Sequence, residues 1–132
     1  MGCSLASSLV DLKKKLKRDV NPDLLFIEPS EMVVTQELLD VTAMGLRDIH
    51  YDVGPFITLV DGPQFDFLWN ERRSLLLGQV QKADLVAISR IDLINPDELA
   101  HINHTLSDYC PRLVGLSVTN DSGIDEIASQ ID

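Results

Sequence analysis

Short apolar runs alternate with amphipathic segments along this chain. The apolar runs cover residues 24–27, 56–60, 85–88 and 113–118. Runs that are apolar at nearly every position are typical of strands that are covered on both faces of a parallel sheet. The alternation therefore predicts an α/β fold of three layers, in which a parallel sheet of about four strands lies between helices.

The segments between the apolar runs have helical periodicity. In the first of them, Leu5, Leu9, Leu12 and Leu16 fall on one face of a helix. A helix with a break near Gly78 is expected over residues 64–82, and Pro at the first helical position predicts another helix from residue 96. The remaining helices are expected over residues 31–45 and 124–131.

Polar side chains follow the predicted strands. In chain order they are Glu28, Asp61, Asp92 and Ser117. Because ligands of parallel sheets bind at the carboxyl ends of the strands, this edge is the predicted binding site. Each carboxylate could equally cap a helix or form a turn, so the residue types alone leave both interpretations open.

Length, net charge and cysteine content limit the classes of protein that fit this sequence. The chain has 132 residues, a length typical of one domain, and its net charge of −10 argues against nucleic acid as the partner. The basic cluster at residues 13–18 suits either the C-terminus of a helix or an acidic partner surface. No apolar run approaches the roughly 20 residues that span a membrane. The two cysteines do not make a disulfide framework, so we expect a cytoplasmic protein.

Cysteine and histidine supply candidate metal ligands. The Cys3 thiolate would suit Zn²⁺ or Cu(I). His101 and His104 are three positions apart and share a helical face, with Cys110 nearby in sequence. No complete set of four ligands is visible, so an ordinary thiol and surface histidines are the simpler interpretation.

Five segments, in this order, resemble motifs of the CobW/HypB/UreG family of P-loop GTPases and metallochaperones. Gly2-Cys3 resembles the start of a Gly-Cys-x-Cys-Cys segment, and residues 25–30 resemble a strand that ends in Glu-x-Ser/Thr-Gly. Residues 58–61 resemble Val-Val-Asp-Ala, and residues 83–93 resemble Ala-Asp-x-x-x-x-Asn-Lys-x-Asp-Leu. Residues 117–126 resemble a Ser-Ala-x-x-Gly-x-Gly ending. The resemblance implies a P-loop NTPase-like fold.

The resemblance also implies a base-binding site. Asp92 would accept hydrogen bonds from the guanine ring N–H and the exocyclic amine. Ser89 and Arg90 stand at the Asn and Lys positions of the same loop, and Ser117 with Val118 would line the base pocket. The implied ligands are GTP and GDP.

A second set of roles concerns metal ions and catalysis. Glu28 would act as the catalytic acid near Mg²⁺ and the attacking water, and Asp61 would face Mg²⁺ and phosphate. Cys3 would be a ligand of a transition metal whose identity the sequence does not name. By resemblance, GTP hydrolysis would gate the insertion of a metal or metal cofactor into a client enzyme. The implied partners are that metalloenzyme or its maturation proteins, with no nucleic acid and no membrane.

Departures from the family pattern weaken the catalytic role. The 132 residues contain no Gly-x-x-x-x-Gly-Lys-Ser/Thr, the loop that cradles phosphates and holds Mg²⁺. The chain therefore resembles a single, partial GTPase domain over residues 1–132 that lacks the first strand and the P-loop, and we expect it to be inactive by itself. Two alternatives remain open. One is a degenerate, non-catalytic GTPase-fold module that binds protein, and the other is an unrelated doubly wound domain.

The first strand of the family pattern, which this chain lacks, would affect how the other strands pair. In a family-type sheet it would lie between residues 24–27 and residues 56–60. Unpaired apolar strand edges seek partners, so we expect these two strands either to pair directly or to pair in a homo-oligomer.

Overall fold

The computed structural model describes residues 3–44 and 52–131 of the chain. The contacts divide it into two compact units, Met1–Val53 and Gly54–Asp132. Helices of the described residues are all too short or too polar to cross a lipid bilayer. The second unit contains the sheet and most of the predicted strand ends.

The first unit contains two helices, α1 (Cys3–Asp19) and α2 (Thr35–Met44). Lys17 and Arg18 lie in the last turn of α1, where cations interact favourably with the helix dipole. The rest of the basic cluster is mixed, because Lys14 and Lys15 are exposed but Lys13 is buried. Both helices were predicted, and α2 begins four residues later than expected.

The predicted first strand does not form. Residues 24–27 have no regular secondary structure, and Leu24 and Phe26 are 56% and 72% exposed. A strand is stable only when its backbone groups pair with a neighbour, and no described strand pairs with this run. The direct pairing of residues 24–27 with residues 56–60 is therefore not observed, and self-association remains a prediction.

A parallel sheet of three strands organises the second unit. The strands are β1 (Ile57–Asp61), β2 (Leu85–Ser89) and β3 (Leu113–Gly115), in the order β1-β2-β3. The register pairs Asp61 with Ser89 and Ile88 with Gly115, so the ends of all three strands lie at one edge. At the opposite end of the sheet, the Asp84 carboxylate accepts a hydrogen bond of 2.7 Å from the Phe56 backbone amide. This bond joins the residue before β1 to the residue before β2.

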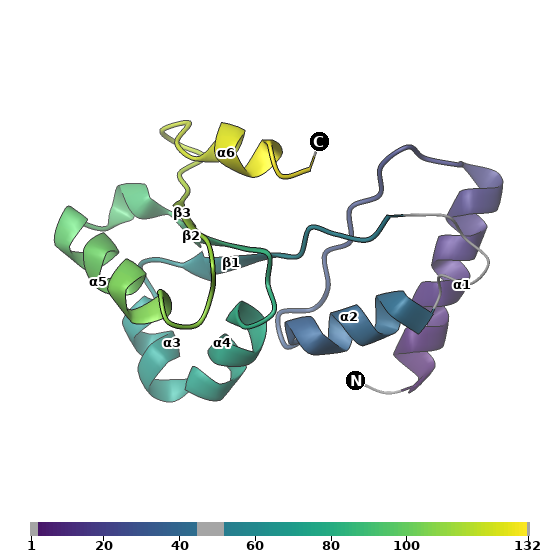
Figure 1. The fold of residues 1–132 in the computed structure, drawn as a ribbon, viewed down its shortest axis with the longest axis horizontal. Helices are drawn as coiled ribbons and strands as arrows, with labels where there is room; N and C mark the ends of the chain where they lie inside the picture. The colour runs from purple at the N-terminus through teal and green to yellow at the C-terminus, as the bar shows by residue number, and fades with distance from the viewer. Residues whose placement is uncertain (1–2, 45–51, 132) are drawn as a thin grey trace. The chain divides into compact units, whose positions relative to one another are not determined.

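Four helices accompany the sheet. They are α3 (Phe65–Glu71), α4 (Arg73–Val80), α5 (Pro96–Leu106) and α6 (Ile124–Ala128), and a 3₁₀ turn, η1 (Ile91–Leu93), precedes α5. Figure 1 shows α3 and α4 on one side of the sheet and α6 on the other. The structure thus confirms an α/β fold with a parallel sheet and flanking helices.

The core joins the sheet to α3, α4 and α5. Val60, Val86 and Ile88 pack with apolar side chains of the three helices, which are Phe65, Leu76, Val80, Ile102 and Leu106. The four apolar residues of β2 are all fully buried, as the unbroken apolar run predicts for a central strand.

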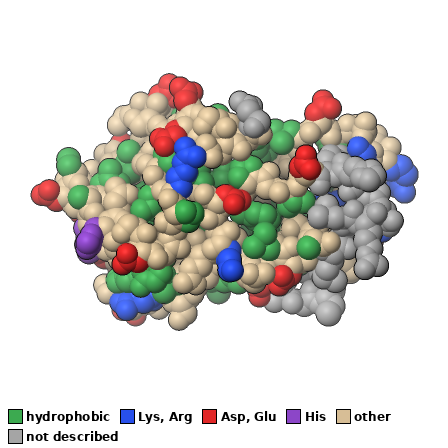
Figure 2. Space-filling view, in the orientation of Figure 1, with side chains coloured by type: hydrophobic (Ala, Val, Ile, Leu, Met, Phe, Trp, Pro, Cys, Tyr) green, Lys and Arg blue, Asp and Glu red, His purple; other side chains and the backbone are tan. Residues whose placement is uncertain are grey.

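On the face drawn in Figure 2, basic side chains do not gather into a single patch, and hydrophobic side chains lie between separate acidic ones.

Two helix boundaries show what local sequence can and cannot predict. The start of α5 is as expected, because Asn95 accepts a hydrogen bond from the Glu98 amide while the Glu98 carboxylate accepts one from the Asn95 amide. The helical segment over residues 64–82 breaks at Arg72 and not near Gly78. Gly78 lies inside α4, whose preceding residue Arg72 leaves helical geometry with φ −134°.

Candidate nucleotide-binding site

Three polar residues, one from each strand end, lie at the carboxyl edge of the sheet. Asp61 ends β1, Ser89 ends β2, and Ser117 lies two residues after the end of β3. The sequence predicted this meeting, since parallel strands bring their carboxyl ends to one edge. Arg90 and Asp92 lie in the loop after β2 and complete the set.

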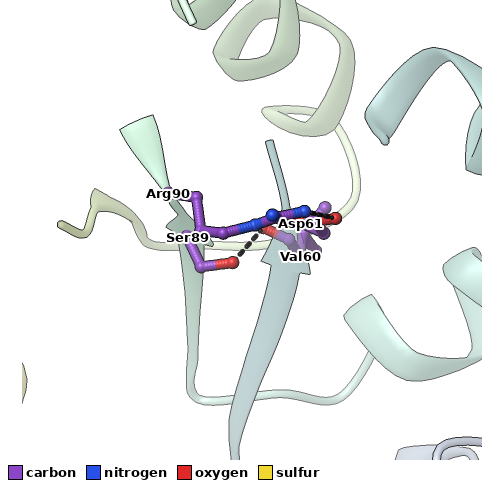
Figure 3. A network of polar contacts seen from close by, with 4 residues as sticks. All are labelled: Val60, Asp61, Ser89 and Arg90. Atoms are coloured by element: carbon purple, nitrogen blue, oxygen red, sulfur yellow. Dashed lines mark hydrogen bonds and ion pairs between the residues drawn. The ribbon is translucent and has the colours of Figure 1, made fainter. Parts of the chain in front are cut away.

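Arg90 and Asp61 form a two-bonded ion pair (Figure 3). The Arg90 Nε donates to one Asp61 carboxylate oxygen at 2.7 Å, and Nη2 donates to the other at 2.5 Å. These bonds, followed by the negative charge of Asp61, raise the pKa of Arg90 above its usual value. The side chains are 52% and 29% exposed, so the pair is in contact with water. The parallel guanidinium–carboxylate geometry is nevertheless the most directional form of ion pair.

The backbone of Arg90 is left-handed, with φ 56° and ψ 40°. This conformation is uncommon for a residue other than glycine. Ser89 is held next to it, because its hydroxyl donates to the Val60 carbonyl at 3.3 Å (Figure 3). The carbonyl of Ser89 also accepts from the Gly62 amide at 3.0 Å. The turn after β2 is thereby joined to the end of β1 through backbone and side chains.

The side chain of Asp92 bonds to the loop after β3, on the side of β2 that is opposite to β1. The Ser117 hydroxyl donates to the Asp92 carboxylate at 2.7 Å, and the Asn120 amide donates to the same hydroxyl at 3.1 Å. Ser117 is only 1% exposed, whereas Asp92 is exposed. The bond uses one carboxylate oxygen of Asp92, so the other oxygen can accept hydrogen bonds from a ligand.

A tight turn places Ser117. Ser117 and Ser122 form an antiparallel bridge, with backbone hydrogen bonds of 3.0 and 2.9 Å. Gly123 follows with φ 78°, and a Cβ atom there would lie 2.1 Å from the Gly115 carbonyl oxygen. Only glycine fits such a position, because any Cβ would overlap this oxygen. Sequence reasoning quoted Gly123 within a motif but did not identify this steric reason.

Exposed apolar side chains flank the Asp92–Ser117 pair. Val118 is 77% exposed and Leu93 is 62% exposed. Each directly follows one member of the pair in sequence, and Leu93 also lines a pocket at the start of α3 and α5. The planar faces of a nucleobase need apolar contacts of this kind, while its edge needs hydrogen-bond partners.

A separate open pocket of about 400 Å³ lies between the start of α3 and α5. Its lining includes Phe65, Ile102, Asp66 and His101, but neither Asp92 nor Ser117. His101 contacts the edge of the Phe65 ring and lies 3.7 Å from the Asp66 carboxylate. His101 is therefore part of an aromatic and polar contact on the surface, the simpler of the two interpretations for this histidine.

The predicted metal ligands are not brought together. Among the described residues, no group of three or more His, Cys, Asp or Glu side chains could hold a metal ion. Cys110 is buried, and desolvation raises the pKa of its thiol, which disfavours the thiolate that metals bind. The side chain of Cys3 lies outside the described residues.

Of the two residues predicted to face Mg²⁺, only Asp61 lies at the end of a strand, as predicted. Glu28 is exposed in the irregular segment of the first unit and does not end a strand. Asp61 does end a strand, but both of its carboxylate oxygens accept hydrogen bonds from Arg90. The residue set described therefore does not fit Mg²⁺, which requires nearly octahedral oxygen ligands.

Comparison with protein families gives one match, a model described as "CobW/HypB/UreG, nucleotide-binding domain", which covers residues 1–114. No curated protein and no solved structure matches the chain. The matched range includes Asp61, Ser89, Arg90 and Asp92 and ends before Ser117.

Proposed function

Because the chain belongs to the CobW/HypB/UreG family, in its nucleotide-binding domain, we propose that it binds guanine nucleotides at the carboxyl edge of its sheet. The base is recognised by the Asp92 carboxylate and rests beside Val118, at the Ser117 loop. Ser89 and Arg90 support the turn after β2, which leads to Asp92, from the β1 side.

The hydrogen bond between Ser117 and Asp92 is the observation that carries this proposal. It orients the Asp92 carboxylate, and it does so from a buried serine in a turn that two backbone hydrogen bonds to Ser122 close. A carboxylate accepts hydrogen bonds only, so it selects a base edge that presents N–H groups. Guanine presents two such donors on one edge, whereas the corresponding ring nitrogen of adenine is an acceptor.

The wider role follows from family membership alone. We propose that GTP binding and hydrolysis in the intact fold regulate the insertion of a metal or metal cofactor into a client enzyme. The client or its maturation proteins would be the partners. Phosphate binding would require a P-loop, which the printed sequence does not contain.

Base selectivity tests the proposal directly. We expect guanosine and GDP to bind the 132-residue chain with affinities within about threefold of each other, because no phosphate cradle is present in it. Adenosine should bind at least about tenfold more weakly, since a site built to accept hydrogen bonds rejects a base that lacks the donors. Titrations followed by the backbone amide signals of residues 92 and 117 would measure this. Equal affinity for guanosine and adenosine, or no saturable binding of either, would contradict the proposal.

GTP hydrolysis by the 132-residue chain should not exceed the rate in buffer. The stabilisation of phosphoryl transfer comes mainly from the P-loop and its Mg²⁺, and Asp61 is already paired with Arg90. Phosphate release with and without Mg²⁺ is the measurement. If release depended on Mg²⁺ and were lost in Glu28→Ala but kept in the control Glu31→Ala, the expectation would be wrong and Glu28 would be catalytic.

A further inference from the structure

The segment after β2, from Arg90 to Asp92 inside η1, is held from two opposite sides. Arg90 reaches the end of β1 through its ion pair with Asp61. Two residues later, Asp92 reaches the loop after β3 through Ser117. Between them, the Ile91 amide donates to the Leu116 carbonyl at 3.2 Å. Contacts to both neighbouring strands thus fix three successive residues.

The left-handed backbone of Arg90 makes this arrangement geometrically possible. It lies between β2 and η1, and the side chains of Arg90 and Asp92 bond to different neighbouring segments, β1 and the loop after β3. An arginine gains nothing locally from φ 56°, unlike asparagine or glycine. Such a conformation persists only where surrounding contacts maintain it. The ion pair with Asp61 is the contact made by the Arg90 side chain itself.

The pairing with Arg90 makes the Asp61 carboxylate a weaker ligand for a divalent cation. Both carboxylate oxygens are engaged by the guanidinium, and the charge of one carboxylate is neutralised by one arginine. A metal ion at this carboxylate would compete with Arg90 for its charge and would weaken the contact that holds Arg90 to β1. The geometry therefore opposes the Mg²⁺-facing role that the family resemblance suggests for Asp61.

We propose that Asp61 and Arg90 are positioning residues of the base site: Asp61 anchors Arg90, and this anchor orients the loop that presents Asp92, so that base recognition is independent of Mg²⁺. The inference rests on the proposed function for its ligand, but the loop geometry can be measured without any ligand.

The first experiment uses the full chain without nucleotide. Amide hydrogen exchange at Ile91 should become about fivefold faster in Arg90→Ala and in Asp61→Asn, in line with an exposed but two-bonded ion pair. The double variant should exchange no faster than either single variant, because both remove the same interaction. Arg112→Ala is the matched control. Its guanidinium lies 3.8 Å from Glu126 and is 42% exposed, and this change should leave Ile91 exchange unaltered.

The second experiment measures guanosine and GDP binding by the same four variants, in millimolar Mg²⁺ and in excess EDTA. The affinity of the unaltered chain should be the same in both solutions, and it should fall about fivefold in Asp61→Asn and Arg90→Ala alike. A loss of GDP affinity in EDTA that disappears in Asp61→Asn would identify Asp61 as a metal ligand and overturn the inference.

The two proposals fail in different ways. If no variant and not even the unaltered chain binds guanosine or GDP, the proposed function is wrong, and Ile91 exchange still decides whether Asp61 and Arg90 position the loop. Unchanged Ile91 exchange in Arg90→Ala and Asp61→Asn would overturn the positioning role even if GDP binds. Faster exchange in both, with no further increase in the double variant, would support it.

Discussion

Replacing Asp92 with asparagine should weaken GDP binding by about 30-fold to several hundredfold and should make the chain prefer xanthine nucleotides. A carboxylate that accepts two hydrogen bonds from guanine contributes roughly 2–4 kcal/mol, and about 1.4 kcal/mol corresponds to a tenfold change in affinity. In Asp92→Asn one acceptor becomes an N–H donor that faces the guanine donors. Xanthine carries a carbonyl oxygen in place of the exocyclic amine and would accept from this donor.

The fold should tolerate this substitution. The side-chain oxygen of asparagine can still accept the hydrogen bond from Ser117, which is 2.7 Å long in the structure. Titrations with GDP and XDP would measure the change in preference, and Asp108→Asn, at an exposed position after α5, is the matched control. GDP affinity within twofold of the unaltered chain, together with no gain for XDP, would remove Asp92 from the base site.

Gly123→Ala should destabilise the second unit by about 2–5 kcal/mol. The added Cβ would lie 2.1 Å from the Gly115 carbonyl oxygen, so the backbone must move. Overpacking of this kind costs about 1–3 kcal/mol, and a left-handed backbone at φ 78° costs a residue with a Cβ about 1–2 kcal/mol more. The movement would disturb the Ser117–Ser122 bridge and hence the bond from Ser117 to Asp92.

Urea denaturation followed by circular dichroism would measure this loss, and guanosine titration would measure its effect on the site. Gly78→Ala is the matched control, because alanine is favoured over glycine inside a helix such as α4 by about 0.5–1 kcal/mol. A Gly123→Ala variant as stable as the unaltered chain would show that the turn after β3 can rearrange freely.

Several features of the molecule were predictable because they depend on residues close together in sequence. The unbroken apolar run at residues 85–88 indicated a central buried strand, and Pro96 at the first helical position indicated the start of α5. The motifs around Asp61 and Asp92 indicated the family. In each case hydrophobic burial or a local hydrogen bond decides the outcome, and both leave a direct pattern in the chain.

Other features depended on which segments meet in space. Residues 24–27 are as apolar as β2, yet they form no strand, because pairing requires a neighbouring strand that local composition cannot supply. The helix break at Arg72 also differs from the expected break near Gly78. A glycine lowers helix propensity by only about 1 kcal/mol, which packing of the buried Leu76 and Val80 offsets.

The candidate site likewise combines features that the local sequence predicts with features that depend on tertiary contacts. The sequence by itself determined that Asp61 and Asp92 follow strands, because strand ends are visible as the ends of apolar runs, whereas Ser117 lay inside the predicted strand 113–118 and the structure ends β3 at Gly115. Only the tertiary structure decided their partners: Asp61 is paired with Arg90 across 29 positions, and Asp92 with Ser117 across 25. These pairings follow from the sheet order and from the left-handed turn at Arg90. Strand order and the backbone conformation of Arg90 are set by the packing of the whole unit, so no local pattern could assign Asp61 to an arginine in place of a metal ion.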